Sequence, residues 1–214
     1  MSPWWLTTGV PPSKVYGAYN ARAASDFNDS LVNRNDPGVD DLTVGVTPAW
    51  DASAGWTFSY AEYLKTGKIP VNGMSVIARA EPSTSYYGAI FGAESDASNL
   101  DDKYFAHARF VSPNTETALL QFGATAVPSI SGSSHVLAMT LSTAGVAAFF
   151  ADGMLESSGT AVVNTLSHPL FVGANNVTGT ASYLFEGSIS AIAIYDTELT
   201  SDQVQSITVG MLGI

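Results

Sequence analysis

The chain has 214 residues, 46% of them hydrophobic, which suits one large all-β domain with its own core. Acidic residues outnumber basic ones by 19 to 8, for a net charge of −11, and the basic residues are scattered along the chain. This argues against a nucleic-acid partner, which needs clustered Lys and Arg. With no cysteine, disulfides, thiolate metal sites and Cys nucleophiles are excluded. The apolar runs are too short to insert into a membrane.

Residues 1–14 contain three prolines and the adjacent pair Trp4 and Trp5, which predicts an irregular arm ahead of one domain at 15–214. Two neighbouring large aromatics in a proline-flanked segment cannot easily both enter one core. We therefore expect Trp4 and Trp5 to contact a partner protein, with packing against their own domain as an equal alternative. The opening residues lack the basic and apolar stretches of a signal peptide.

The rest of the chain predicts many short strands separated by turn residues. Residues 15–19 form the first, and residues 20–50 are rich in turn signals, with at most one helical turn within 21–25. The remaining predicted strands are 56–59, 63–66, 74–80, 87–91, 104–110, 118–122, 135–142, 146–151, 170–173 and 188–195.

Three local patterns near the C-terminus are more specific. Asp152-Gly153 between two apolar pairs predicts a hairpin. Residues 188–195 are apolar at both alternating phases, which is typical of a central strand, and Gly187 before them predicts a close backbone approach or a bulge. Thr200 and Gln203 fit a capping box that opens a short helical turn. Together these patterns predict a β-sandwich.

The closing segment resembles that of concanavalin A-like and laminin G-like jelly rolls. Its Gly187-Ser188-Ile189 strand runs to Tyr195-Asp196 and then to a Leu-Thr-x-x-Gln-Val sequence at 199–204. The hairpin at 149–153 and the strand at 170–173 look like further parts of that family. Shorter segments in the N-terminal half, such as 4–6, 48–51 and 55–58, are similar to structural proteins of tailed bacteriophages that carry this jelly roll.

The resemblance implies an all-β, concanavalin A-like jelly-roll sandwich of two antiparallel sheets. It also implies a non-enzymatic structural protein on a virion surface, a capsid or tail decoration or adhesion module that binds other virion proteins and host surface glycans. Self-association into a homo-oligomer is expected, because the arm can bury itself in a neighbouring copy. A free carbohydrate-binding lectin is the alternative, and a glycoside hydrolase is a third, weaker one.

No catalytic residue is assigned. Laminarinase-type enzymes of this fold carry two glutamates flanking an aspartate, and the nearest match, residues 94–99, lacks the second glutamate. We expect no cofactor. Calcium is the one candidate metal, since Ca²⁺ favours carboxylates on loops, and its candidate ligands are Glu94, Asp96, Asp101 and Asp102; a solvated acidic loop is the simpler interpretation.

Candidate glycan contacts come from aromatic and amide side chains. Tyr86 and Tyr87 are adjacent in the sequence, so their rings point to opposite sides and one can be exposed. Asn175 and Asn176 lie in a loop rich in Asn, Thr, Ser and Gly, where side chains can hydrogen-bond sugar hydroxyls but are also ordinary loop residues.

Overall fold

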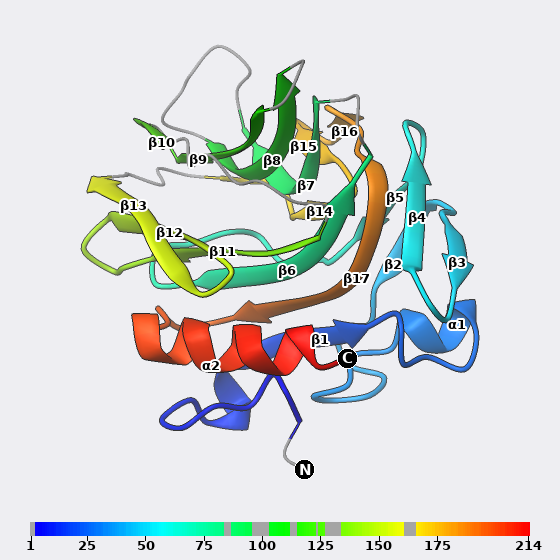
Figure 1. The fold of residues 1–214 in the computed structure, drawn as a ribbon, viewed down its shortest axis with the longest axis horizontal. Coiled ribbons are helices and arrows are strands. Elements are labelled where there is room, and N and C mark those ends of the chain that lie inside the picture. Colours follow the sequence, from blue (N-terminus) through cyan, green and yellow to red (C-terminus); the bar gives the residue numbers. More distant parts are fainter. Residues whose placement is uncertain are drawn as a thin grey trace.

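A computed structural model describes residues 3–83, 87–95, 103–111, 115–122, 124–126, 134–160 and 166–214. Within these ranges two β-sheets pack face to face, and a twelve-residue helix crosses the outer side of one sheet (Figure 1). The predicted all-β jelly-roll sandwich is confirmed. The described part of the chain has no helix with the length and apolar character needed to span a membrane.

Sheet A is the sheet beside this helix. Its order is β13-β12-β11-β6-β17-β4-β3, and β1 pairs with the second half of β17. Its strands are β1 (Val15–Asn20), β3 (Ala49–Asp51), β4 (Gly55–Ser59), β6 (Ser75–Pro82), β11 (His135–Leu141), β12 (Val146–Ala151), β13 (Met154–Thr160) and β17 (Glu186–Tyr195).

Sheet B has the order β10-β9-β8-β7-β14-β5-β2, with β15 and β16 attached beside β7. The pairings are antiparallel except that of β15 with β7, which is parallel. Its strands are β2 (Thr43–Val46), β5 (Tyr63–Lys65), β7 (Tyr87–Glu94), β8 (Lys103–Val111), β9 (Thr115–Phe122), β10 (Ala124–Ala126), β14 (Phe171–Val172), β15 (Asn175–Val177) and β16 (Thr180–Ser182).

The helices differ from the sequence prediction in place and length. The helical turn lies at α1 (Phe27–Ser30) instead of within 21–25, because the Asp26 side chain accepts a hydrogen bond from the Asp29 N–H and begins the helix there. A 3₁₀ turn, η1 (Pro12–Lys14), precedes β1. The Thr200–Gln203 capping box is confirmed, but it opens a full helix, α2 (Ser201–Leu212), where one short turn was expected.

The predicted central strand is confirmed as β17, which lies between β6 and β4 in sheet A. Gly187 at its start has the predicted close approach, since a Cβ there would lie 2.4 Å from the carbonyl oxygen of Glu81. The Asp152-Gly153 hairpin between β12 and β13 is also confirmed, with both residues at positive φ, as a type I′ turn requires.

The larger core lies between the two sheets. Along the strands of sheet A, residues of this core alternate with residues of a second core on the other side of the sheet. On β11, for example, Leu137 and Met139 face the other sheet, whereas Val136 and Ala138 face outward. Trp56 at 0% exposure is the largest side chain in the core between the sheets.

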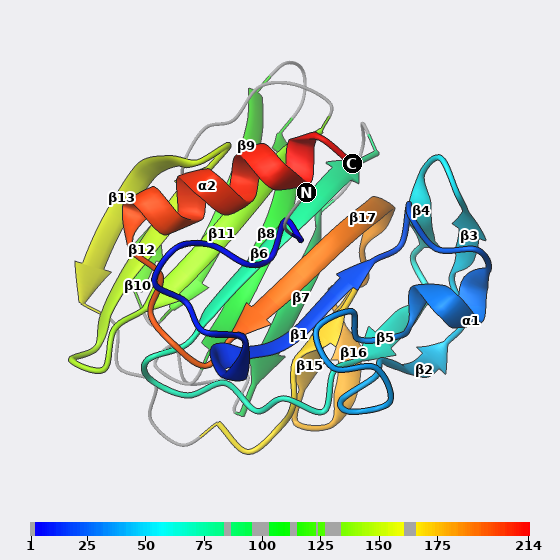
Figure 2. The same ribbon diagram turned by 90° about the horizontal axis from the view of Figure 1, so that it is seen from below.

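The second core lies on the outer side of sheet A, under α2 and the N-terminal arm (Figure 2). The helix contributes side chains that recur every three or four residues, and this spacing explains why it continues well beyond one turn. The buried helix residues are Val204, Ile207, Thr208 and Met211. Burial of this stripe against sheet A, more than intrinsic propensity, stabilises the helix.

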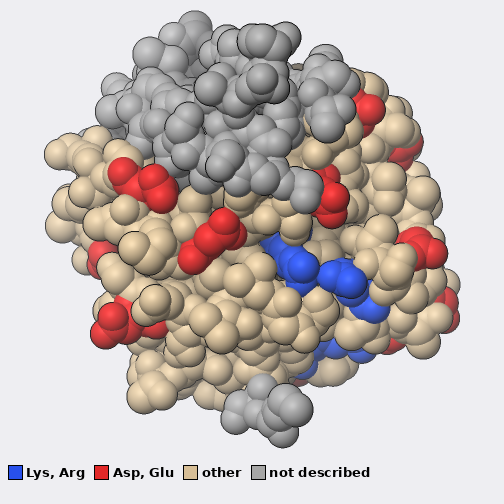
Figure 3. Space-filling model, viewed as in Figure 1, with Lys and Arg blue, Asp and Glu red and all other residues tan. Residues whose placement is uncertain are grey.

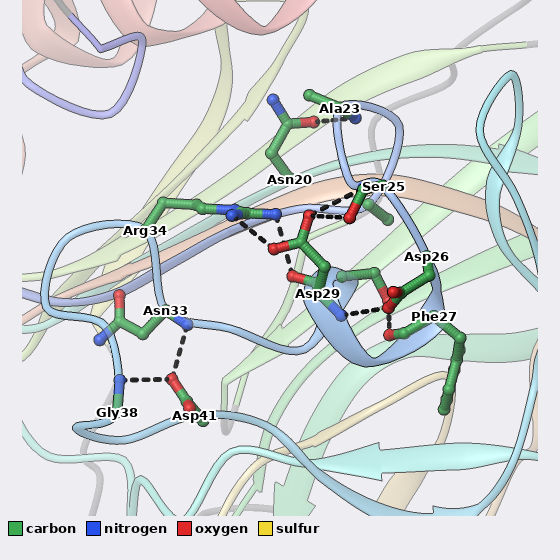
Figure 4. A network of polar contacts seen from close by, with 12 residues as sticks. Asn20, Ala23, Ser25, Asp26, Phe27, Asp29, Asn33, Arg34, Gly38 and Asp41 are labelled. Atoms are coloured by element: carbon green, nitrogen blue, oxygen red, sulfur yellow. Dashed lines mark hydrogen bonds and ion pairs between the residues drawn. The ribbon is translucent and has the colours of Figure 1, made fainter.

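The segment between β1 and β2 is ordered by side-chain hydrogen bonds to the backbone (Figure 4). Asn33 is fully buried; its Oδ1 accepts from the N–H of Ala18, and its Nδ2 donates to the carbonyls of Tyr16 and Val39. Such bonds replace a regular ladder, so a sequence rich in turn residues still forms a fixed segment.

Acid should weaken one contact of this segment measurably. The Arg34 guanidinium, with Nη1 2.9 Å from the Asp29 carboxylate, lowers the pKa of Asp29 to about 2, with help from the Ser25 N–H. The unfolded chain therefore binds a proton first, and the stabilisation from this contact is lost as the pH falls from about 4 to about 2. We expect the difference in unfolding free energy between the wild type and Asp29→Asn to shrink over that interval. The difference between the wild type and Arg34→Gln should shrink in the same way. A difference that stays constant would contradict this.

Candidate functional site

The part of sheet A beyond α2 and the arm has a polar outer side. Figure 2 shows the beginning of β17, beside β4, lying clear of the helix. Here the side chains that alternate with core residues are hydroxyl-bearing or charged, in contrast to the apolar ones under the helix. This polar face consists of Thr57, Ser59, Arg79, Glu81, Ser83, Glu186, Ser188 and Ser190.

A bulge in β17 begins the construction of a pocket on the polar face. The register with β6 shifts between Ile189 and Ala191, which frees the carbonyl of Ser190 from the ladder. That carbonyl accepts hydrogen bonds from the N–H groups of Ala21 and Arg22, at 3.0 and 3.3 Å. The bulge therefore fixes the chain leaving β1 so that Arg22 lines the pocket.

The turn between β3 and β4 forms another wall. Asp51 accepts hydrogen bonds from both the N–H and the hydroxyl of Ser53, which holds the turn. Gly55, at φ +88°, lets this turn lie against the bulge, because a Cβ there would be 2.6 Å from the carbonyl oxygen of Ile189.

The end of α2 holds in place the two arginines that line the pocket. Arg79 on β6 donates from Nη1 to the carbonyl of Met211 at 2.9 Å and to a backbone oxygen of Ile214, the last residue of the sequence, at 2.8 Å. Arg22 donates from Nη1 to the same Ile214 oxygen at 3.1 Å. The pocket has a volume of about 140 Å³, and Glu81, Ser134, Ser188 and Ser190 complete most of its lining. Basic side chains on the face shown in Figure 3 gather near its middle, whereas acidic ones are scattered.

Adding one methyl group at Gly55 should disturb this wall. In Gly55→Ala both the positive φ and the contact with the Ile189 carbonyl are unfavourable, and we expect a loss of about 1–3 kcal/mol of unfolding free energy, measured by denaturant titration. Gly159→Ala on β13 is the matched control, since a Cβ there meets nothing within 4 Å. Equal stability of the two variants would contradict the tight approach at Gly55.

Two connections between the sheets, β4 to β5 and β16 to β17, lie beside the end of β6 and the start of β7, at the end of the polar face away from α2. They are tied together by hydrogen bonds from the N–H groups of Tyr60, Ser83 and Ala89 to the carbonyls of Phe185, Glu186 and Tyr183, respectively. Two exposed tyrosines of these connections, Tyr60 at 38% and Tyr183 at 48%, form what we call the tyrosine rim. Both have positive φ, at 71° and 47°, a strained backbone that occurs often at binding sites.

The polar face and the tyrosine rim are continuous through β17. Glu186 and Ser188, which lines the pocket, are two residues apart, so only about 7 Å of strand separates the end near the rim from the pocket. Beside the rim, a carboxylate oxygen of Glu186 and the hydroxyl of Ser83 are buried and have no hydrogen-bond partner within the described residues. Unsatisfied buried oxygens are costly, and a ligand with hydroxyl groups can satisfy them.

The structure places the two arm tryptophans against their own domain. Trp4 and Trp5 form an edge-to-face pair with centroids 5.4 Å apart, and both pack, half-buried, on the second core. The Tyr195 hydroxyl donates to the Trp5 carbonyl at 3.0 Å, and the Trp4 backbone lies over Gly210 of α2. Of the two alternatives, intramolecular packing is observed, and contact with a partner protein stays a prediction.

Two of the four predicted glycan contacts are buried. Asn175 and Asn176 are 0% and 1% exposed, and their side-chain amides donate to Glu94 and to the Pro169 carbonyl, so in this conformation neither can reach a surface sugar. These amides instead order the segment around β15. Tyr86 and the side chain of Tyr87 lie outside the described residues.

The predicted calcium ligands are only partly described. Glu94 is 1% exposed and accepts a hydrogen bond from Asn175 at 2.9 Å, which places it in the interior, whereas Asp96, Asp101 and Asp102 lie outside the described residues. The described residues contain no group of three His, Asp or Glu side chains able to hold a metal ion. Calcium binding by this loop stays a prediction.

The sequence prediction missed the polar face, although a signal exists. Arg79, Glu81 and Ser83 alternate with small or apolar residues, and so do Glu186, Ser188 and Ser190. After the bulge at Ser190 the alternation shifts by one residue, and the outer side of β17 continues with the apolar Ala191 and Ala193. This switch within one strand marks where the covering helix ends.

The comparisons with known proteins agree with this architecture. The profile of the concanavalin A-like lectin/glucanases superfamily matches residues 41–205, and the chain belongs to that family. No curated protein matches its sequence.

Solved structures share the fold at low sequence identity. Domain 4 of AbnA, an extracellular arabinanase from Geobacillus stearothermophilus solved with arabinotriose, has a TM-score of 0.58 and 18% identity over 91% of this chain and 98% of that one. The binding domain of botulinum neurotoxin serotype D has a TM-score of 0.61 and 10% identity over 94% of this chain and 52% of that one. A mutant of NanB sialidase from Streptococcus pneumoniae has a TM-score of 0.53 and 14% identity over 75% of this chain and 28% of that one.

The chain thus spans about half of the neurotoxin domain and about a quarter of the sialidase chain.

Proposed function

We propose that the chain is a non-enzymatic glycan-binding module and that the glycan rests on the polar face. The observation that carries this proposal is that α2 and the arm cover only the apolar part of sheet A and leave a hydroxyl-rich part with a pocket open. Serine and threonine hydroxyls both donate and accept, as sugar hydroxyls do. The tyrosine rim supplies aromatic surface on which a sugar ring can stack.

Family and fold support the same proposal. The superfamily description names lectins, and domain 4 of AbnA, which this chain resembles over nearly its full length, was solved with a bound arabinose oligomer. Carbohydrate binding is therefore the function to test first.

A glycoside hydrolase is the second candidate, because two glutamates lie close on this face. Glu81 pairs with Ser188, so Glu186 is its diagonal neighbour on β17. The backbones of such neighbours are about 7–8 Å apart. Their flexible side chains can therefore place the two carboxyls at the separation of about 6.5–9.5 Å that inverting enzymes use. Release of reducing sugar that is lost in Glu186→Gln would favour this candidate over the binding module.

We further propose the setting that the sequence resemblance implies: an adhesion or decoration module on a virus particle, self-associated and facing host glycans. The N-terminal segments similar to phage structural proteins support it. Detection of the protein in purified particles tests this location, and its presence only in the free fraction would contradict it.

The glycan proposal is tested by a glycan array with the purified chain. We expect binding to at least one class of glycan, and loss of that binding in Ser188→Phe, which fills the pocket from β17. Ser158→Phe, at an exposed position on β13 of the same sheet, is the matched control and should bind as the wild type does. Binding that survives Ser188→Phe would contradict the assignment to the polar face.

A further inference from the structure

The turn between β5 and β6 carries the one Asn-Gly pair of the sequence, Asn72-Gly73. Asn72 is exposed, and Gly73 has a φ of +84°, a conformation that glycine adopts without strain. The amide carbon of an asparagine can be attacked by the backbone nitrogen of the next residue. Glycine in that place shields its nitrogen least, because it has no Cβ. The turn therefore combines the residue types that react most readily in this way with exposure to water.

Hydrogen bonds protect other asparagines of the chain from this reaction. The backbone N–H that follows Asn28 donates to the Asp26 carboxylate at 2.8 Å. The backbone N–H that follows Asn33 donates to the Ala18 carbonyl at 2.7 Å. In both places the nitrogen that would attack is engaged in a bond that stabilises the fold.

The groups at Asn72 are not engaged in this way. Within the part of the chain that the structure describes, neither the side-chain amide of Asn72 nor the N–H of Gly73 has a hydrogen-bond partner. The amide is therefore free to rotate toward the Gly73 nitrogen. Of the asparagines compared here, only this one joins an exposed amide to an unoccupied nitrogen.

We propose that Asn72 is a site of spontaneous deamidation. The Gly73 nitrogen forms a bond to Cγ of Asn72 and loses its proton, the bond from Cγ to Nδ2 breaks, and ammonia leaves. Water then opens the resulting cyclic imide at either of its carbonyl carbons. One opening gives aspartate; the other gives isoaspartate, in which the main chain runs through the former side chain. Water is the only co-reactant, and the modified position lies away from the residues that line the pocket.

Isoaspartate at position 72 lengthens the main chain directly before β6. The residue after the turn, Met74, is fully buried, and its carbonyl accepts a hydrogen bond from the Leu141 N–H at 2.9 Å. Gly73 also lies close to the turn between β11 and β12, because a Cβ there would be 2.9 Å from Cγ2 of Thr143. With neighbours this close, an added main-chain atom displaces the start of β6. Aspartate adds only a charge on an exposed side chain.

The test is to incubate the full chain in mildly alkaline buffer and to follow its tryptic peptides by mass spectrometry. Cleavage after Lys68 and Arg79 isolates residues 69–79, in which Asn72 is the one side chain with an amide. We expect this peptide to gain the mass difference between an acid and an amide and to separate into two chromatographic forms. The peptide of residues 23–34, which contains Asn28 and Asn33, should keep its mass.

Two controls separate the chemistry from the fold. Asn72→Gln keeps an amide but places its carbon one bond farther from the Gly73 nitrogen, so the mass gain should be lost. A synthetic peptide of residues 69–79 shows the reaction without the fold. Mass gain in the synthetic peptide but not in the folded chain would overturn the inference, because the native turn would then protect Asn72. Equal mass gain in residues 23–34 of the folded chain would overturn it as well.

The effect on β6 has its own measurement. The incubated protein, enriched in isoaspartate, should unfold at a lower urea concentration than freshly prepared Asn72→Asp, which carries the charge without the added main-chain atom. Equal unfolding midpoints would contradict the displacement of β6.

Discussion

Replacement of Trp56 by alanine is expected to lower the free energy of unfolding by about 3–5 kcal/mol. Trp56 is fully buried in the core between the sheets, so its removal leaves a cavity that the two sheets cannot close. The indole Nε1 also donates to the Ser30 hydroxyl at 2.8 Å, which ties β4 to the helical turn α1. Loss of the ring therefore loosens both the sandwich and the segment that leads to β2.

Trp56→Phe separates the two contributions. Phenylalanine keeps much of the buried volume but loses the hydrogen bond, so its cost should be smaller than that of alanine, about 1–3 kcal/mol. Both variants are compared with the wild type by urea unfolding. An alanine variant within 1 kcal/mol of the wild type would contradict the assignment of Trp56 to the core.

Deletion of residues 1–12 is expected to be nearly as costly, roughly 4 kcal/mol. The deletion removes buried Val10 and half-buried Trp4, Trp5 and Leu6, and it uncovers apolar side chains of sheet A. Both the loss of stability, measured by urea unfolding, and the binding of a hydrophobic dye should report this exposure.

The same deletion decides between the two predicted roles of the arm. An arm whose main role is docking on a particle should leave the stability of its domain unchanged, and that outcome would contradict the packing described above. The control is Val209→Ala, a substitution on the solvent-facing side of α2, where Val209 is 67% exposed. It should change the free energy of unfolding little.

Much of the fold could be predicted from the sequence, because alternation and turn residues act locally. The hairpin at Asp152-Gly153 could be predicted because these two residue types readily adopt the positive φ angles of its turn. The strand β17 could be predicted because its sequence has apolar residues on both faces. The short strands β15 and β16 could not be predicted, because Asn175 and Asn176 are polar residues whose amides are satisfied by distant groups.

The candidate site was less predictable, for a similar reason. Its pocket brings together the bulge at Ser190, Arg22 beside that bulge and Arg79 on β6, which are far apart in the sequence. Tyr86 and Tyr87 were expected to contact glycans, whereas the exposed tyrosines that the structure describes beside this face are Tyr60 and Tyr183, both at positive φ. No local pattern specifies that backbone for tyrosine.

The most direct test of the central claim, that the polar face binds glycans, is to map amide NMR shifts while the strongest glycan from the array is added. We predict that the signals of Ser53, Glu81, Ser188 and Ser190 move together and saturate with the same affinity, while those of α2 before its last turn and of β13 stay in place. Shifts confined to sheet B or to the N-terminal arm would contradict the claim.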